Sequence, residues 1–158
     1  MSGPAMNRVV KDFKADATSD MTVHLKGLRG KQVALYFYPK DATPGCTNES
    51  IDFTNLSPKF KRANTEIFGI SRDSLASHEK FRTKHNMPFE LISDPDEALC
   101  RYFDVIKEKN MYGKKVMGIE RSTFLIDADG KLRAEWRKVR VPGHAEDVLE
   151  AAKALNQG

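Results

Sequence analysis

The chain has 158 residues, of which 40% are hydrophobic and 30% charged, with a formal net charge of +4. These values fit one globular domain, and no apolar run approaches the ~20 residues that a membrane-spanning helix needs. Lys and Arg alternate with Asp and Glu along most of the chain without any nucleic-acid motif, so we expect neither membrane nor nucleic-acid binding. Only two cysteines and no apolar signal-peptide core favour the reducing cytoplasm. A second methionine, Met6, predicts that residues 1–5 are a cloning remnant and that residues 6–158 form a single domain.

After a short extended N-terminal region, the hydrophobic pattern alternates between strands and helices. Pro58 is expected to interrupt or restart the first helix, Ser74 to cap the second, and Pro95 to take the first position of the third. Residues 104–120 are expected to form a loop, whose lysine-rich part at residues 107–115 is expected to be mobile and solvated. This order predicts an α/β fold with a mixed central sheet and helices on both faces. The predicted strands are residues 31–38, 66–71, 89–92, 122–126 and 131–137, and the predicted helices are residues 43–56, 74–84, 94–102 and from 144 onward.

The stretch YFYPKDATPGCTNE, residues 36–49, ends a hydrophobic strand and begins a helix near a single cysteine. Cys46 lies where the helix starts, with Thr43 three residues before it and Glu49 three residues after it. A helix N-terminus carries about half a positive charge and unpaired N–H donors, which favour a thiolate over a thiol. A buried, inert cysteine is the usual alternative, but the neighbours here are Pro, Gly, Thr and Asn rather than apolar residues. The pattern therefore predicts that Cys46 is reactive.

The pattern Pro39-x-x-x-Thr43-x-x-Cys46 resembles the active-site signature of the peroxiredoxins. The fuller string YFYPKDATPGCTNES, with MGIERSTFLID at residues 117–127, is similar to the bacterioferritin comigratory protein, or peroxiredoxin Q, subfamily, and the resemblance covers residues 7–155. It implies a thioredoxin-like fold and a cofactor-free thiol peroxidase that reduces hydrogen peroxide and organic hydroperoxides. It also implies thioredoxin, or glutaredoxin with glutathione, as the reductant, and a monomer or weak homodimer.

A reactive thiolate alone does not make a fast peroxidase. Lowering the pKa of a thiol from ~8.5 to about 6 raises its thiolate fraction roughly thirtyfold but reduces its nucleophilicity, for a net gain of about two- to threefold. Other groups must hold the peroxide and stabilise charge on the leaving oxygen. Thr43 is expected to accept from the peroxide while donating toward the thiolate, and Pro39 to close one wall of the pocket. The resemblance implies that Arg121 supplies a cation and that Glu49 orients it.

The chain lacks the second cysteine that many members of this subfamily carry. Ile51 occupies the position five residues after Cys46, and the predicted helix at 74–84, where some relatives have a cysteine, contains none. The remaining cysteine, Cys100, has Leu99 and Phe103 as neighbours, which favours a core position over a resolving role. We therefore expect a one-cysteine cycle, in which Cys46 becomes a sulfenic acid and an external thiol restores it.

Three other functions stay open from the sequence. An atypical two-cysteine peroxidase would pair Cys46 with Cys100, which requires Cα atoms within roughly 7 Å. A disulfide oxidoreductase ordinarily needs Cys-x-x-Cys, and Thr43 replaces its first cysteine. A redox-sensing interaction module would use the thiol once rather than in turnover. The four histidines are scattered without metal-ligand spacing, so surface or capping roles are expected and no metal site is predicted.

Overall fold

The computed structural model describes residues 3–157, so the prediction for residues 1–5 falls partly outside the described residues. Each predicted strand is present within two residues of its expected bounds. The strands of the main sheet are β1 (Lys14–Ala17), β2 (Met21–His24), β3 (Gln32–Phe37), β4 (Thr65–Ser71), β5 (Glu90–Ser93), β8 (Ser122–Ile126) and β9 (Leu132–Trp136). The helices are α1 (Pro44–Arg62), α2 (Leu75–Lys84), α3 (Ala98–Tyr102) and α4 (His144–Gln157), with a short 3-10 helix, η1 (Leu25–Leu28).

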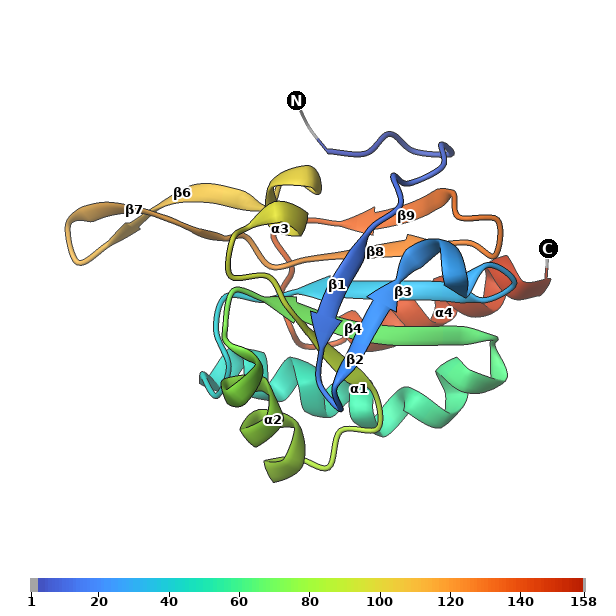
Figure 1. The fold of residues 1–158 in the computed structure, drawn as a ribbon, viewed down its shortest axis with the longest axis horizontal. Coiled ribbons are helices and arrows are strands. Elements are labelled where there is room, and N and C mark those ends of the chain that lie inside the picture. Colours follow the sequence, from blue (N-terminus) through green and yellow to red (C-terminus); the bar gives the residue numbers. More distant parts are fainter. Residues whose placement is uncertain (1–2, 158) are drawn as a thin grey trace.

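The sheet has seven strands in the order β2-β1-β5-β4-β3-β8-β9 (Figure 1). Strands β3, β4 and β5 pair in parallel, whereas β1 with β2, β3 with β8, and β8 with β9 pair antiparallel. The sheet is therefore mixed, as predicted. Within residues 3–157, no helix combines the length and the apolar character needed to cross a bilayer.

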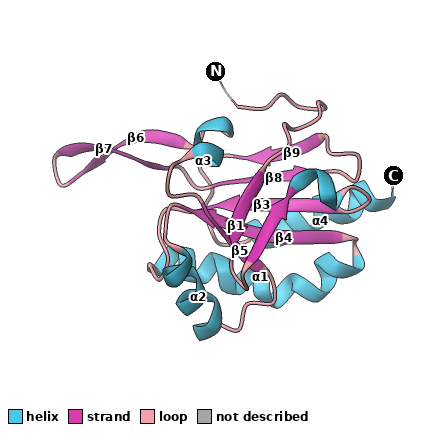
Figure 2. Cartoon of the chain, viewed as in Figure 1, coloured by secondary structure: helices cyan, strands magenta, loops and turns pink. Residues whose placement is uncertain are grey.

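Two hydrophobic cores lie on opposite faces of this sheet. Successive residues of a strand point to opposite faces, so Leu35 of β3 joins the core that includes residues of η1 and α3, whereas Tyr36 joins the core that includes residues of α1, α2 and α4. After Gln32, strand β3 is an unbroken apolar run, as expected for a strand whose two faces are both covered (Figure 2). The two cysteines belong to different cores: Cys100 to the first and Cys46 to the second.

The prediction that Pro58 interrupts the first helix is wrong, since α1 continues through it to Arg62. A proline inside a helix removes one backbone hydrogen bond. Phe53 and Phe60, on either side of Pro58, are both fully buried against the sheet. Their burial holds the two halves of the helix on one axis and outweighs the missing bond.

The prediction that Pro95 opens the third helix is also wrong, because α3 begins only at Ala98. The backbone N–H of Glu97 donates to the carbonyl oxygen of Asp94 at 3.1 Å, which closes a turn over these residues. The carboxylate of Asp94 then accepts from the backbone N–H groups of Leu99 (3.1 Å) and Cys100 (2.8 Å). These contacts provide acceptors for backbone N–H groups in the first turn of the helix. The helix therefore begins three residues after Pro95, where the sequence had predicted its start.

The expected loop at residues 104–120 is instead a hairpin of β6 (Ile106–Met111) and β7 (Lys114–Ile119). It projects away from the main sheet at the left of Figure 1. Tyr112 and Gly113 form its two-residue turn with φ values of 52° and 78°, the left-handed pair that a type I′ turn requires. The hairpin was missed because most of its side chains stay exposed, which leaves little apolar alternation in the sequence.

Candidate active site

Cys46 is the third residue of α1, as the sequence predicted. Thr43 is the N-cap in an extended conformation, and Pro44 opens the helix. Cys46 is therefore among the first residues of the helix, whose N–H groups have no acceptor within the helix and point toward its N-terminal end. The side chain is 1% exposed in the resting structure. This position supplies the partial positive charge that the sequence analysis required.

The antiparallel pairing of β3 with β8 brings Arg121 to Cys46. Phe37 at the end of β3 is opposite Ser122 at the start of β8, so the residue before Ser122 lies beside the segment that leads into α1. The Nη2 of Arg121 donates to the Sγ of Cys46 at 3.4 Å. Its Nη1 donates to Oε1 of Glu49 at 2.6 Å. The structure thus brings together Cys46, Glu49 and Arg121, three of the five residues that the sequence and the resemblance singled out, although Cys46 and Arg121 are 75 residues apart in the chain.

The Arg121–Glu49 pair is largely removed from water. Glu49 is 1% exposed, and its Oε2 has no hydrogen-bond partner among the described residues. Burial raises the pKa of Glu49 from 4.5 to about 7, although Arg121 acts in the opposite direction. Burial also opposes the charge of Arg121, but the negative charges of Glu49 and Cys46 outweigh it and raise the pKa of the guanidinium. Arg121 therefore remains a cation that faces both the sulfur and the carboxylate.

Thr43 and Pro39 both lie in the segment between β3 and α1, and both are half-buried. The hydroxyl of Thr43 donates to the carbonyl oxygen of Lys40 at 2.8 Å. The predicted donation toward the thiolate is therefore not the bond that this structure contains, because the single hydroxyl proton closes the turn before the helix. The oxygen of Thr43 keeps its capacity to accept a hydrogen bond.

Lys109 is a residue near the site that the sequence analysis missed. It lies on β6 of the hairpin, and its Nζ donates to the carbonyl oxygen of Ile119, two residues before Arg121. Burial and the positive charge of Arg121 lower the pKa of Lys109, whereas Cys46 acts in the opposite direction. A second cation therefore contributes to the potential around the sulfur. Only the hairpin register reveals it, since nothing in the local sequence separates Lys109 from the other lysines.

Cys100 lies in the core on the far side of the sheet and is fully buried. Burial and then its hydrogen bond to Asp94 raise the pKa of the Cys100 thiol far above its ordinary value. A thiol in this environment stays protonated and unreactive. The core position predicted for Cys100 agrees with this location.

The expectation of surface or capping roles for the histidines is wrong for His78 and His144, which are both buried and contact Asp41 and Thr123 through their rings. Asp41, Asp73 and His78 bring possible ligand atoms within 4.8 Å of one another. Nδ1 of His78 lies 2.7 Å from Oδ2 of Asp41, a hydrogen-bond distance, and the carboxylate of Asp73 accepts from the backbone N–H of Asp41 and from the hydroxyl of Ser71. We therefore describe this cluster as a hydrogen-bonded group.

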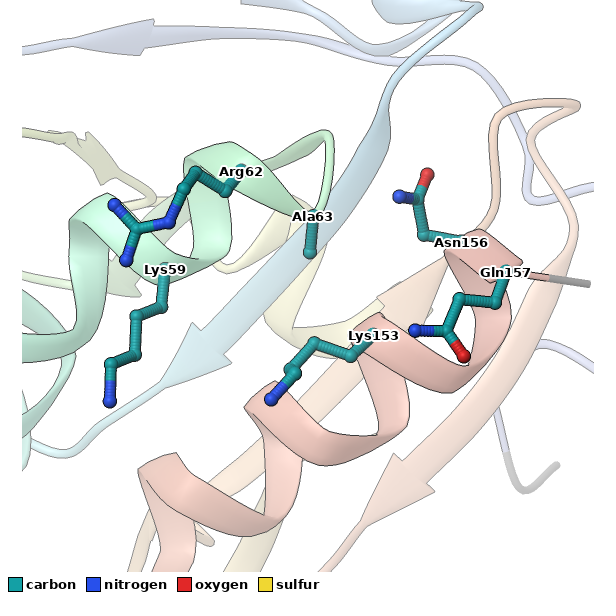
Figure 3. A pocket seen from close by; sticks show the side chains of 6 residues that line it. All are labelled: Lys59, Arg62, Ala63, Lys153, Asn156 and Gln157. Atoms are coloured by element: carbon teal, nitrogen blue, oxygen red, sulfur yellow. The ribbon is translucent and has the colours of Figure 1, made fainter.

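A hollow of about 310 Å³ lies away from Cys46, between the C-terminal ends of α1 and α4 (Figure 3). The charged side chains that line it are Lys59, Arg62 and Lys153, and Asn156 and Gln157 complete the rim. Its lining is basic and polar, and none of the candidate site residues lies in it.

Comparison with known proteins identifies the family of the chain. A profile of the AhpC/TSA family matches residues 6–135. The chain is 56% identical to Peroxiredoxin Bcp of Xanthomonas campestris over 146 residues, which covers 87% of this chain and 91% of that protein. It is 48% identical to Peroxiredoxin Bcp of Bacillus subtilis over 146 residues, which covers 92% of this chain and 93% of that protein. The solved structure of Xanthomonas campestris Peroxiredoxin Q has a TM-score of 0.87 at 52% identity over 91% of both chains. A cysteine-to-serine mutant of Xylella fastidiosa PrxQ has a TM-score of 0.92 at 42% identity over 98% of both chains.

The chain belongs to the AhpC/TSA family, and its relatives place it among the Bcp, or Q, peroxiredoxins. It is a thiol peroxidase, and its family implies a peroxide as substrate and a thiol as reductant. The predicted thioredoxin-like fold is confirmed.

Proposed function

We propose that Cys46 is the nucleophile that reduces the peroxide. The observation that carries this proposal is the position of Arg121, which donates to the Cys46 sulfur and to buried Glu49 through two different nitrogens. A thiolate at this sulfur is stabilised by the guanidinium and by the N-terminus of α1. The same donors remain in place for the negative charge that develops on the peroxide oxygens during attack.

The first step is a displacement at oxygen. The Cys46 thiolate attacks one peroxide oxygen, an S–O bond forms, and the O–O bond breaks. The leaving oxygen departs as an alkoxide or hydroxide and takes up a proton, which gives an alcohol or water. The sulfur is oxidised to a sulfenic acid and the peroxide is reduced. In this step Arg121 stabilises the charge, Glu49 holds Arg121, Thr43 accepts from the peroxide, and Pro39 excludes water.

The second half of the cycle uses an external thiol. The reductant attacks the sulfenic sulfur and releases water, and a second thiol then frees Cys46 and leaves as a disulfide with the first. Cys100 does not take part, because it is a protonated thiol in the core on the other face of the sheet. Thioredoxin, or glutaredoxin with glutathione, fits the role of reductant. We include organic hydroperoxides among the substrates, since the Xanthomonas campestris bacterioferritin comigratory protein is described by its alkyl peroxide reduction activity.

Intact mass after oxidation tests this cycle directly. One equivalent of peroxide without reductant should add one oxygen to the wild-type chain, and a sulfenic-acid reagent should trap it. Cys46→Ser should consume no peroxide, whereas Cys100→Ser should turn over with an external thiol like the wild type.

Two other products would contradict the one-cysteine cycle. A loss of two hydrogens with a peptide that links Cys46 to Cys100 would identify an intramolecular disulfide. A covalent dimer that persists in Cys100→Ser would identify a disulfide between two copies of Cys46. Turnover in Cys46→Ser would remove Cys46 from the mechanism altogether.

A further inference from the structure

Asp41, five residues before Cys46, ties the active-site segment to helix α2. The carboxylate of Asp41 is buried and accepts from the hydroxyl groups of Tyr38 through Oδ1 and of Ser77 through Oδ2 at 2.8 Å. Oδ2 also lies 2.7 Å from Nδ1 of His78, a side chain with no exposed surface. The backbone N–H of Asp41 donates to the carboxylate of Asp73 at 2.9 Å. These partners lie immediately after β3, in the first turn of α2 and in the segment after β4.

The contact between His78 and Asp41 requires a proton of its own. The Nε2 of His78 lies 3.0 Å from the carbonyl oxygen of Ile92, and a carbonyl can only accept, so Nε2 carries a proton. The contact of 2.7 Å between Nδ1 and Oδ2 then needs a second proton, because a bare nitrogen and a bare carboxylate oxygen would repel each other. That proton belongs either to His78, which makes an ion pair, or to Asp41, which makes a neutral pair.

Further contacts hold the carboxylate of Asp41 in place. It accepts hydrogen bonds from the hydroxyl groups of Tyr38 and Ser77 as well as contacting His78. Burial raises the pKa of Tyr38 well above its usual value, so this hydroxyl keeps its proton and donates it. Ser77 and His78 both lie in the first turn of α2, so one helix supplies two of the three side chains that hold Asp41.

We propose that the buried contact between His78 and Asp41 positions the segment that carries Cys46. The other charged groups around the pair are Asp73, whose carboxylate accepts from the backbone N–H of Asp41, and Lys80 and Lys84, which line the hollow beside Asp41.

The pair acts on Cys46 through a short and strained piece of backbone. Ala42, next to Asp41, has φ of 65°, a conformation that a residue with a Cβ adopts only when its surroundings impose it. Thr43, the N-cap of α1, follows immediately, and Cys46 lies three residues later. Release of Asp41 would let Ala42 relax and would move the start of the helix. His78 is thus a positioning residue, and this inference rests on the proposed role of Cys46.

Nitrogen-15 NMR of the histidine rings of the wild-type protein tests the contact without any change in the pair. The ring of His78 has no exposed surface and both of its nitrogens lie within hydrogen-bond distance of an oxygen, so it should show a ring N–H proton that is protected from exchange with solvent. Assignment uses His78→Gln, whose spectrum lacks the signal. A ring proton of His78 that exchanges as fast as those of the exposed histidines overturns the proposal, and this result is independent of the role of Cys46.

A double-mutant cycle tests the positioning. His78→Gln and Asp41→Asn should each lower the second-order rate constant for oxidation of Cys46 by hydrogen peroxide roughly ten- to a hundredfold, as displaced catalytic groups do. The double variant should regain most of that loss, because Gln and Asn can form a neutral hydrogen-bonded pair. His85→Gln, at the C-terminal end of the same helix, is the matched control and should react like the wild type.

Three outcomes overturn the positioning. The single variants could react at the wild-type rate, the double variant could lose at least the sum of the two single losses, or His85→Gln could lose as much as His78→Gln. If Cys46→Ser also keeps full activity, the failure belongs to the proposed nucleophile rather than to the pair.

Discussion

Replacement of Arg121 by Met separates its structural role from its role in the reaction. The change removes the cation that contacts both Cys46 and Glu49 but keeps a long side chain in the same space. Glu49 is 1% exposed, so the variant leaves a buried carboxylate without its partner. Loss of one member of a buried pair costs about 3–5 kcal/mol of unfolding free energy. Loss of a preorganised donor lowers the rate roughly ten- to a thousandfold.

The loss of unfolding free energy in Arg121→Met should depend on pH, because the burial of Glu49 raises its pKa in the folded protein. The folded-state pKa of Glu49, about 7, lies above the unfolded value of 4.5. Its contribution to stability is therefore fully present below pH 4.5 and is lost as the pH rises through 7, by on the order of 3 kcal/mol in the wild type. Without Arg121 the pKa of Glu49 rises further. The destabilisation of Arg121→Met should thus be small near about pH 5 and large near about pH 8.

Adding Glu49→Gln to Arg121→Met should restore most of the unfolding free energy at the higher pH, because no buried charge remains. It should not restore the rate, because the cation beside Cys46 is still absent. Urea unfolding at both pH values measures the first quantity, and stopped-flow oxidation by hydrogen peroxide measures the second. Loss of a preorganised donor should slow the reaction about tenfold or more. A double variant that reacts within about threefold of the wild type would therefore show that Arg121 serves only as the structural partner of Glu49.

Three further changes probe other parts of the site. A Cβ on Gly45 would lie 3.2 Å from Nη2 of Arg121, so Gly45→Ala should stabilise α1 by up to about 1 kcal/mol in urea unfolding yet slow peroxide reduction, and an unchanged rate would contradict the close approach. Thr43→Val removes the hydroxyl oxygen and should slow the reaction with peroxide roughly ten- to a thousandfold in the same stopped-flow assay; a rate within twofold would exclude it from the pocket. Burial lowers the pKa of His144 from 6.5 to about 4, so its stabilising effect is complete above pH 6.5 and is lost as the pH falls toward 4. His144→Gln should flatten urea stability across that range by roughly 3 kcal/mol, and a profile parallel to the wild type would contradict the buried neutral ring.

Local signals in the sequence were enough for some elements and for the position of the thiol. The apolar run of β3, the cap at Ser74 and the turn before Cys46 each depend on residues a few positions apart, and all three are present. Arg121 could be assigned only through the family resemblance, because its contact with Cys46 spans 75 residues.

Other features depend on how distant segments meet, which a single sequence does not contain. The contact between Asp41 and His78 spans 37 residues and required the packing of α2 against the end of β3. The charge of Lys109 near the site required the register of a hairpin whose exposed strands carry little apolar pattern. The turn at Tyr112 and Gly113 was the one local signal for that hairpin, and the abundance of lysine around it favoured a loop instead.

On the proposed cycle, the sheet that separates Cys46 from Cys100 also determines how this enzyme can be inactivated. The sulfenic acid at Cys46 then has no thiol in its own core with which to condense. Two bimolecular reactions then compete for it: a thiol that regenerates the enzyme, and a second peroxide that produces a sulfinic acid. The fraction of molecules lost in each turnover is set by the ratio of those two rates. The working lifetime of the protein is therefore a property of the concentrations of thiol and peroxide around it, and no internal disulfide shields the sulfur when the thiol runs short.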